Sequence, residues 1–188
     1  MVASLKALAL IRMDSKTLPN IFLVGPMGSG KSSIGRQLAA LCKHRFFDSD
    51  KEIQDRTGAD IPWIFDVEGE EGFRDREQAM LAELCEHQGI VLATGGGSIK
   101  REANRTLLQN KGVVVYLDTS VEEQIKRTSR DKNRPLLQTE DPAATLKALM
   151  EERRPLYLDV AHISVNTNRR NLKDVANEII KKVKSLPN

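Results

Sequence analysis

The stretch GPMGSGKS, residues 25–32, has the residue types and the spacing of a phosphate-binding loop. It fits GxxxxGK followed by Ser or Thr, with an apolar run before it and a helical pattern after it. Glycines let successive backbone N–H groups converge on phosphate oxygens, and the N-terminus of the following helix adds partial positive charge. In this pattern Lys31 reaches the β- and γ-phosphates and Ser32 can ligate Mg²⁺. The strand–loop–helix context disfavours a chance match, so the stretch predicts binding of a nucleoside triphosphate.

A second glycine-rich stretch, TGGGS at residues 94–98, follows the apolar run 90–93. Three consecutive glycines bury no side chain and cost conformational entropy on folding, so something must require bare backbone there. An ordinary strand-to-helix turn would be satisfied by one glycine. The stretch therefore indicates a loop that lies close to another group, separate from the phosphate loop.

Two aspartates follow the predicted second strand, in the stretch FFDSD. Ligands bind at the carboxyl ends of strands in open α/β sheets, and strand alternation would put Asp48 and Asp50 on the same side. One carboxylate near Mg²⁺ and one near an acceptor hydroxyl would suit phosphoryl transfer. The alternative is that Asp50 only caps the helix that begins at Lys51. We favour the functional interpretation because the phosphate loop lies at the same edge of the sheet.

A phosphate loop is found in GTPase switches, motor ATPases and small-molecule kinases. A switch should carry an NKxD motif after a strand, but the strand VVVYL leads to DTSVEE. A motor usually has a strand that ends in an acidic pair, but the third predicted strand here ends in ATGGG. The small size, the single phosphate loop and the charged, lid-like segment SRDKNRPLLQTED at residues 129–141 favour a kinase of a small acceptor.

The elements that position these loops alternate along the chain. Short, continuously apolar runs are separated by helical patterns, which is typical of a parallel sheet with helices on both faces. We therefore expect a three-layer α/β/α sandwich. The predicted strands are residues 20–24, 45–48, 90–93, 113–117 and 162–165.

Local signals predict where several helices begin and end. Asp60 followed by Pro62 is typical of a helix start, and Ser120 with Glu123 forms a capping-box pattern. The helix that includes Leu146 is expected to stop before Pro155, because the residue before a proline disfavours helical geometry.

The composition is that of an ordinary globular protein of 188 residues, 40% hydrophobic and 29% charged, which predicts one domain. A net charge of +3 suits anionic small molecules, and 4% aromatic residues leave little for stacking on nucleic-acid bases. We expect no nucleic-acid partner. Cys42 and Cys85 are interpreted as buried thiols of a reducing cytosol, and the scattered histidines share no metal-ligand spacing.

The first residues, 1–19, are interpreted as a poorly ordered leader before a single kinase domain at 20–188. Their apolar run is too short to span a bilayer and lacks a cleavage site after a long apolar core. A start at Met13 is an alternative explanation. We expect a cytoplasmic protein without membrane contact.

Seven stretches, taken in order, resemble the shikimate kinase family. They are GPMGSGKSSIGRQLA, FFDSD, EEGFRDRE, ATGGGS, RPLL, RRPLY and TNRR, and they extend from residue 25 to residue 170. Only the first is generic to phosphate-loop proteins. The resemblance implies a P-loop NTPase fold of the nucleoside monophosphate kinase type with a mobile lid. It also implies a monomer that uses ATP and Mg²⁺ to phosphorylate the 3-hydroxyl of shikimate, a step toward chorismate and aromatic amino acids.

The resemblance implies roles for particular side chains on the acceptor side. Arg74 and Arg153 match the arginines that bind the shikimate carboxylate, for which paired guanidinium donors are suited. Asp50 matches the residue that binds ring hydroxyls and orients or deprotonates the attacking one. Asp48 matches a position that helps to hold Mg²⁺ through water, with Ser32 as the direct ligand. Considered without the resemblance, each arginine would usually be a surface residue.

The resemblance also implies a role for the second glycine loop. Gly95, Gly96 and Gly97 match the family's substrate loop, whose backbone comes close to the shikimate ring and the γ-phosphate. A Cβ atom there would clash with the ligand.

On the nucleotide side, Arg134 in RPLL matches a lid arginine that reaches the phosphates as charge develops, and lid closure would exclude water. Arg127 and Arg170 match positions that flank the adenine, with a solvated basic face as their alternative. Leu172 stands where many relatives have proline, a departure on the adenine side. The residues implied in ATP binding are Gly28, Ser29, Gly30, Lys31, Ser32, Ser33, Arg127, Arg134 and Arg170.

Two other functions stay open from the sequence. A kinase for another polyol or sugar acid would not need Arg74 and Arg153 together. A non-catalytic nucleotide-binding regulator would not need Lys31, Asp50 and Arg134 all to be intact.

Overall fold

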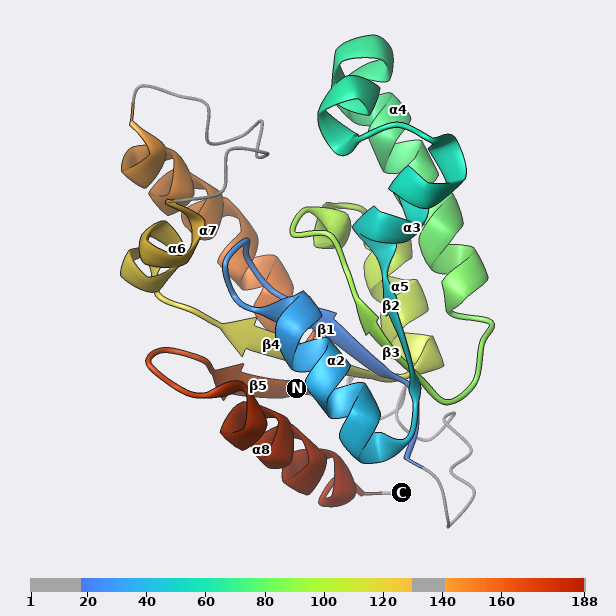
Figure 1. Cartoon of the computed structure of the whole chain (residues 1–188), viewed down its shortest axis with the longest axis vertical. Coiled ribbons are helices and arrows are strands. Elements are labelled where there is room, and N and C mark those ends of the chain that lie inside the picture. The colour runs from blue at the N-terminus through green and yellow to red at the C-terminus, as the bar shows by residue number, and fades with distance from the viewer. Residues whose placement is uncertain (1–17, 130–140, 188) are drawn as a thin grey trace.

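Five parallel strands form the sheet in the computed structural model, which describes residues 18–129 and 141–187 (Figure 1). Their spatial order is β2–β3–β1–β4–β5, so the first strand lies in the centre. The continuous apolar runs of β1 and β3 are fully buried, as expected for strands covered on both faces. The strands are β1 (Ile21–Val24), β2 (Arg45–Asp48), β3 (Ile90–Ala93), β4 (Val113–Asp118) and β5 (Ile163–Asn166).

Helices cover both faces, each above its own apolar core (Figure 1). On one face α2 and α8 pack over residues such as Leu23 and Val115. On the other face α4, α5 and α7 pack over residues such as Phe22 and Val114. The three-layer prediction is confirmed. The helices are α2 (Lys31–Cys42), α3 (Ser49–Thr57), α4 (Ile61–Leu84), α5 (Glu102–Lys111), α6 (Val121–Thr128), α7 (Pro142–Val160) and α8 (Leu172–Lys184), with a 3₁₀ turn η1 (Ser98–Lys100).

Both predicted helix starts are confirmed. The Asp60 side chain accepts a hydrogen bond from the Trp63 N–H at 2.9 Å, and Pro62 lies in the first turn of α4. The Ser120 hydroxyl accepts from the Glu123 N–H at 3.4 Å and caps α6. These caps use local contacts, which is why the sequence alone predicts them.

The prediction that a helix stops before Pro155 is wrong, because α7 continues through it to Val160. A proline inside a helix removes one backbone hydrogen bond and costs about 3 kcal/mol. Here the last turns bury Tyr157 and Val160 completely, and the Tyr157 ring stacks on Tyr116 at 5.1 Å. Burial of these two large side chains offsets the local cost of Pro155.

The long helix α4 contains a kink. Gly69 has φ 71° and ψ −178°, outside helical geometry, and divides α4 into two segments. A side chain would be strained at that φ, so glycine suits the position. Arg74 lies in the second segment, which also carries the buried residues Phe73 and Glu77.

Among the residues that the structure describes, none of the helices is long and apolar enough to cross a membrane. The predicted leader lies outside the described residues up to position 17, and the one-domain organisation stays a prediction. Cys42 and Cys85 are free thiols, half-buried and buried respectively.

Candidate active site

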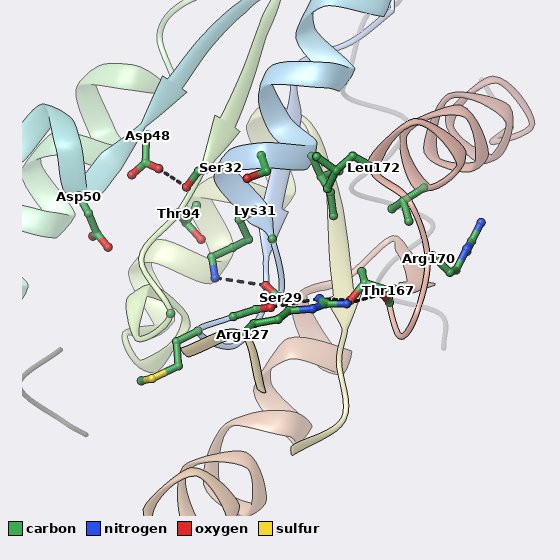
Figure 2. Close-up of a pocket in the computed structure, with 17 residues that line it drawn as sticks. Ser29, Lys31, Ser32, Asp48, Asp50, Thr94, Arg127, Thr167, Arg170 and Leu172 are labelled. Atoms are coloured by element: carbon green, nitrogen blue, oxygen red, sulfur yellow. Dashed lines mark hydrogen bonds between the residues drawn. The ribbon is translucent and has the colours of Figure 1, made fainter. Parts of the chain in front are cut away.

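The loops that follow β1, β2 and β3 meet at the carboxyl edge of the sheet, as expected for an open α/β fold (Figure 2). Between them lies a cavity of about 450 Å³. Its lining includes much of the phosphate loop, both predicted aspartates, and the end of β3. The lining residues are Met27, Gly28, Ser29, Gly30, Lys31, Ser32, Ser33, Ile34, Asp48, Asp50, Thr94, Gly96, Arg127, Thr167, Arg170, Leu172 and Val175.

The phosphate loop needs glycine at two positions for different reasons. Gly30 is the N-cap of α2 in left-handed geometry, with φ 89°. Gly28 also has positive φ, and a Cβ there would lie 3.2 Å from the Cα of Gln124 in α6. The Lys31 ammonium folds over the loop and donates to the carbonyl oxygens of Gly25 and Pro26, each at 2.8 Å. The loop thus places a cation and a helix N-terminus at the cavity wall.

Ser32 and Asp48 are brought together at the cavity wall (Figure 2). The Ser32 hydroxyl donates to Asp48 Oδ2 at 2.5 Å. A hydroxyl and a carboxylate oxygen side by side are the kind of ligands that Mg²⁺ binds alongside nucleotide phosphates.

The two aspartates lie at the edge of the sheet where the sequence placed them, but the geometry predicted to relate them is wrong. Asp48, not Asp50, is the N-cap of α3, since its side chain accepts from the Lys51 N–H at 3.4 Å. Asp50 lies in the first turn of α3, so strand alternation does not relate the two residues. Both nevertheless line the cavity, because the chain turns into the helix at this edge.

Arg74 and Glu77 form a buried ion pair on α4. Arg74 is 6% exposed and Glu77 is fully buried, and Arg74 Nη1 donates to Glu77 Oε2 at 2.7 Å. A longer contact of 3.3 Å joins Arg74 Nη2 to Glu70. Burial raises the pKa of the Glu77 carboxyl above its usual value, and the charge of Arg74 opposes that shift. Arg74 is therefore not the surface residue that its sequence neighbours would suggest.

Two of the three consecutive glycines, Gly95 and Gly97, are required by close packing. A Cβ on Gly95 would lie 2.5 Å from Glu77 Oε1 and 2.8 Å from Asp50 Oδ1, and one on Gly97 would lie 2.7 Å from Arg74 Cζ. Gly96 differs, because its Cβ would meet nothing closer than 3.7 Å, and it lines the cavity. The loop is thus fitted against the Glu77 and Asp50 carboxylates and Arg74.

Arg153 reaches the same region from α7, on the far side of the glycine loop. It is 6% exposed and acts on the pKa of Glu77 together with Arg74. One helical turn later, the Tyr157 hydroxyl donates to the Gly96 carbonyl oxygen at 2.5 Å. The structure therefore brings Arg74 and Arg153 together around Glu77, although they are 79 positions apart in the sequence.

Arg127 and Arg170 border the opposite end of the cavity (Figure 2). Arg127 donates to the carbonyl oxygens of Gly28 and Thr167, at 3.1 and 2.8 Å. Arg170 pairs with Glu178 at 2.5 Å. These contacts hold both arginines at the cavity wall, and their role beside the adenine stays a prediction.

Some residues near the site were not predicted, and some predicted residues lie outside the described part of the chain. Arg134 and most of the predicted lid, residues 130–140, lie outside the described residues. Glu77 and Tyr157 were not predicted as site residues. The sequence contains one signal for Glu77, a charged residue at a core position in the apolar pattern of Phe73, Met80 and Leu84.

Comparisons with known proteins agree with this geometry. The family model described as shikimate kinase matches residues 27–184. A shikimate kinase from Vibrio parahaemolyticus is 60% identical over 162 residues, which are 86% of this chain and 94% of that protein. Shikimate kinase 1 from Pectobacterium atrosepticum is 59% identical over 167 residues, 88% of this chain and 96% of that one.

Solved structures give the same result. Shikimate kinase from Acinetobacter baumannii in complex with shikimate has a TM-score of 0.88 and 51% identity, covering 95% of this chain and 97% of that one. A deoxyadenosine kinase from M. mycoides with bound dATP, 16% identical, covers 88% of this chain and all of that one at a TM-score of 0.59, which reflects a common fold alone. The expected fold, a P-loop kinase with a central parallel sheet, is confirmed. The chain belongs to the shikimate kinase family.

Proposed function

We propose that the chain transfers the γ-phosphoryl group of ATP to the 3-hydroxyl of shikimate and releases shikimate 3-phosphate and ADP. One observation carries the choice of acceptor. Among the described residues, the buried charged side chains are Arg74, Arg153 and Glu77, so buried guanidinium groups outnumber buried carboxylates. Buried charges are costly unless they are paired, and the carboxylate of an acceptor would add a negative charge beside the two arginines.

On the nucleotide side, the phosphate loop supports binding of the triphosphate. Its backbone N–H groups and the N-terminus of α2 would hold the phosphates, and Lys31 would turn from its carbonyl partners to the β- and γ-phosphates. Arg127 and Arg170 would border the adenine, with Leu172 beside it in the cavity wall. Arg134 would contact the transferring group, a role supported by the family resemblance of RPLL.

On the acceptor side, Arg74 and Arg153 would bind the shikimate carboxylate. Arg74 Nη1 is held by Glu77, whereas the 3.3 Å contact of Nη2 with half-exposed Glu70 is the one that an incoming carboxylate would replace. The glycine loop would line the ring. Asp50, within reach of the same loop and lining the cavity, would accept a hydrogen bond from the attacking hydroxyl and orient it.

The residues present fit one Mg²⁺ ion. Ser32 would be the direct ligand, and Asp48 would act through water, which is consistent with their 2.5 Å hydrogen bond. No group of three or more His, Cys, Asp or Glu in the described part of the chain could hold a metal ion without the nucleotide. This suits Mg²⁺, which keeps waters and phosphate oxygens as ligands. When bound, the ion would neutralise charge on the phosphate oxygens.

We further propose a cytoplasmic monomer that needs no nucleic acid, membrane or protein partner, with residues 20–188 acting as one kinase domain. The mild net charge of +3 and the small share of aromatic residues support this view.

ADP release from the purified protein with Mg-ATP tests the proposal, with shikimate, quinate or gluconate as the acceptor. We expect ADP with shikimate, loss of activity when EDTA removes the metal, and recovery with added Mg²⁺. ADP release with quinate or gluconate but not with shikimate would show that the protein is a kinase of a different acceptor. ATP binding without ADP release from any acceptor would favour a non-catalytic nucleotide-binding regulator. Lys31→Ala should lower turnover by roughly 100-fold or more while the fold stays intact.

A further inference from the structure

Tyr157 lies at the meeting point of α7 and the glycine loop. It is fully buried, and its ring stacks on Tyr116 with centroids 5.1 Å apart. Its hydroxyl donates to the Gly96 carbonyl oxygen at 2.5 Å. Burial raises the pKa of Tyr157, so the hydroxyl stays protonated and remains a donor at neutral pH.

A cation of the predicted acceptor site lies close to the same hydroxyl. Arg153 comes four residues earlier and is therefore one turn away on the same face of α7, and its positive charge opposes the rise in the pKa of Tyr157. Tyr157 is thus hydrogen-bonded to the glycine loop and adjacent along α7 to Arg153.

Holding the Gly96 carbonyl fixes the direction of the next N–H. In a planar trans peptide the carbonyl of Gly96 and the N–H of Gly97 point in opposite directions. Other groups of the loop are already engaged, since the Gly95 N–H donates to Ser49 and the Ser98 N–H to the Gly95 carbonyl. No described residue accepts a hydrogen bond from the N–H of Gly97.

We propose that Tyr157 is a positioning residue of the acceptor site. Its hydroxyl orients the Gly96–Gly97 peptide, so that the Gly97 N–H faces the acceptor. This inference rests on the proposed function and adds to it a residue that touches no reacting atom. It also explains why α7 continues past Pro155, because only a continuous helix places Arg153 and Tyr157 one turn apart.

Tyr157→Phe tests the proposal because it keeps the stacked ring and removes only the hydroxyl. We expect KM for shikimate to rise roughly tenfold and kcat to fall several-fold, the usual size of effect when a buried hydrogen-bond group loses its partner. KM for ATP should stay within about twofold of wild type. Tyr116→Phe is the matched control. Its hydroxyl donates to Asp118 at 3.0 Å, away from the loop, so its kinetic constants should not change.

A merely structural role predicts a different result. Both variants would lower the melting temperature, and the folded Tyr157→Phe enzyme would keep the KM for shikimate and the kcat of wild type. That result would overturn the proposal. If wild-type protein released no ADP with shikimate, the proposed function would fail first, and this inference with it.

A measurement on the unmutated chain covers the case in which Tyr157→Phe does not fold. The chain has two tyrosines, so labelling with 3-fluorotyrosine gives two ¹⁹F resonances, which Tyr116→Phe assigns. Saturating shikimate should shift the resonance of Tyr157 more than that of Tyr116, because the Tyr157 hydroxyl is bonded to the glycine loop and the Tyr116 hydroxyl to Asp118. An unmoved Tyr157 resonance at saturation would contradict the proposal.

Discussion

Two arginines that are two positions apart on α4 have opposite environments. Arg74 is buried against Glu77, whereas Arg76 is exposed and pairs with Glu68 through two hydrogen bonds of 2.6 Å. The stretch GFRDRE presents both in the same way, and the family resemblance, not the local pattern, singles out Arg74. Local sequence does not encode which face of the helix will meet the glycine loop, because Gly97, which contacts Arg74, comes 23 residues later in the chain.

This pair provides a direct test of the acceptor site. Arg74→Ala should raise KM for shikimate by on the order of 100-fold, because a charge-assisted contact of a few kcal/mol is lost. KM for ATP should hardly change. Steady-state kinetics with each substrate varied in turn makes the measurement.

Arg76→Ala is the control for Arg74→Ala. It removes an exposed ion pair, which contributes little to stability because solvent screens it, and should leave both Michaelis constants unchanged. Equal effects of the two substitutions on shikimate would show that the assignment of Arg74 is wrong.

At the scale of elements, the glycine loop is defined by what packs against it. Gly97→Ala places a methyl group on the Arg74 guanidinium, which Glu77 holds in place. We expect KM for shikimate to rise roughly tenfold, since Arg74 must shift, with ATP binding intact. Titration calorimetry with each ligand makes the measurement.

Gly58→Ala is the control for the loop. Gly58 has φ 68° and open space around it, so this change should cost about 1 kcal/mol of stability and leave shikimate affinity unchanged. If Gly97→Ala bound shikimate as wild type does, Arg74 could not be the group that the loop holds.

Element bounds were predictable where local chemistry sets them. The predicted ends of the second strand agree with the observed ones. Asp60 and Ser120 cap α4 and α6, as their sequence patterns predict. The extent of α7 was not predictable, because burial of Tyr157 against another strand overrides the proline signal. The sequence signals separate a helix that starts at Asp60 from a longer one that opens at Gly72, and in the structure the kink at Gly69 divides α4 between these two points.

For the whole molecule, one histidine links stability to pH. His162 Nδ1 accepts a hydrogen bond from the Val114 N–H at 3.0 Å, and its Nε2 is buried without a partner in the described part of the chain. Burial lowers the pKa of His162 from its ordinary value of 6.5. Below pH 6.5 the unfolded chain therefore binds a proton that the folded state does not.

The free energy of unfolding should accordingly decrease as pH falls below 6.5. His162→Asn keeps an acceptor for the Val114 N–H and removes the titrating group, so its stability should depend less on pH between about 5 and 7. Urea denaturation at several pH values makes the comparison. Parallel curves for the two proteins would contradict this role of His162.

The two cysteines report on opening of the whole fold. Burial raises the pKa of Cys85 to about 12, whereas Cys42 is half-buried near the end of α2. In a Cys42→Ser variant, the remaining thiol should react with a disulfide reagent at least about 100-fold more slowly in native protein than in guanidinium. Fast modification under native conditions would show that the core around α4 opens locally.

The alternation of elements in the sequence predicts a parallel sheet but not its strand order. Order depends on pairings such as Phe22 with Leu92 and Val114, which are 70 and 92 positions away. The aspartates and the phosphate loop could be assigned to one edge, because all parallel strands end there. The convergence of Arg74 and Arg153 could not be derived from local sequence, because it requires the strand order and the packing of α4 and α7.

The central place of β1 has a consequence for how the chain is made. Ribosomes add about 5–20 residues per second, so β1 waits several seconds before β3 and β4, its partners on either side, are synthesised. During that time the segment Ile21–Val24 has neither of its neighbouring strands, although α2, which packs against it, is already synthesised. The nascent chain therefore exposes an unpaired apolar segment at Ile21–Val24. We expect chaperones that recognise short apolar segments to bind it there.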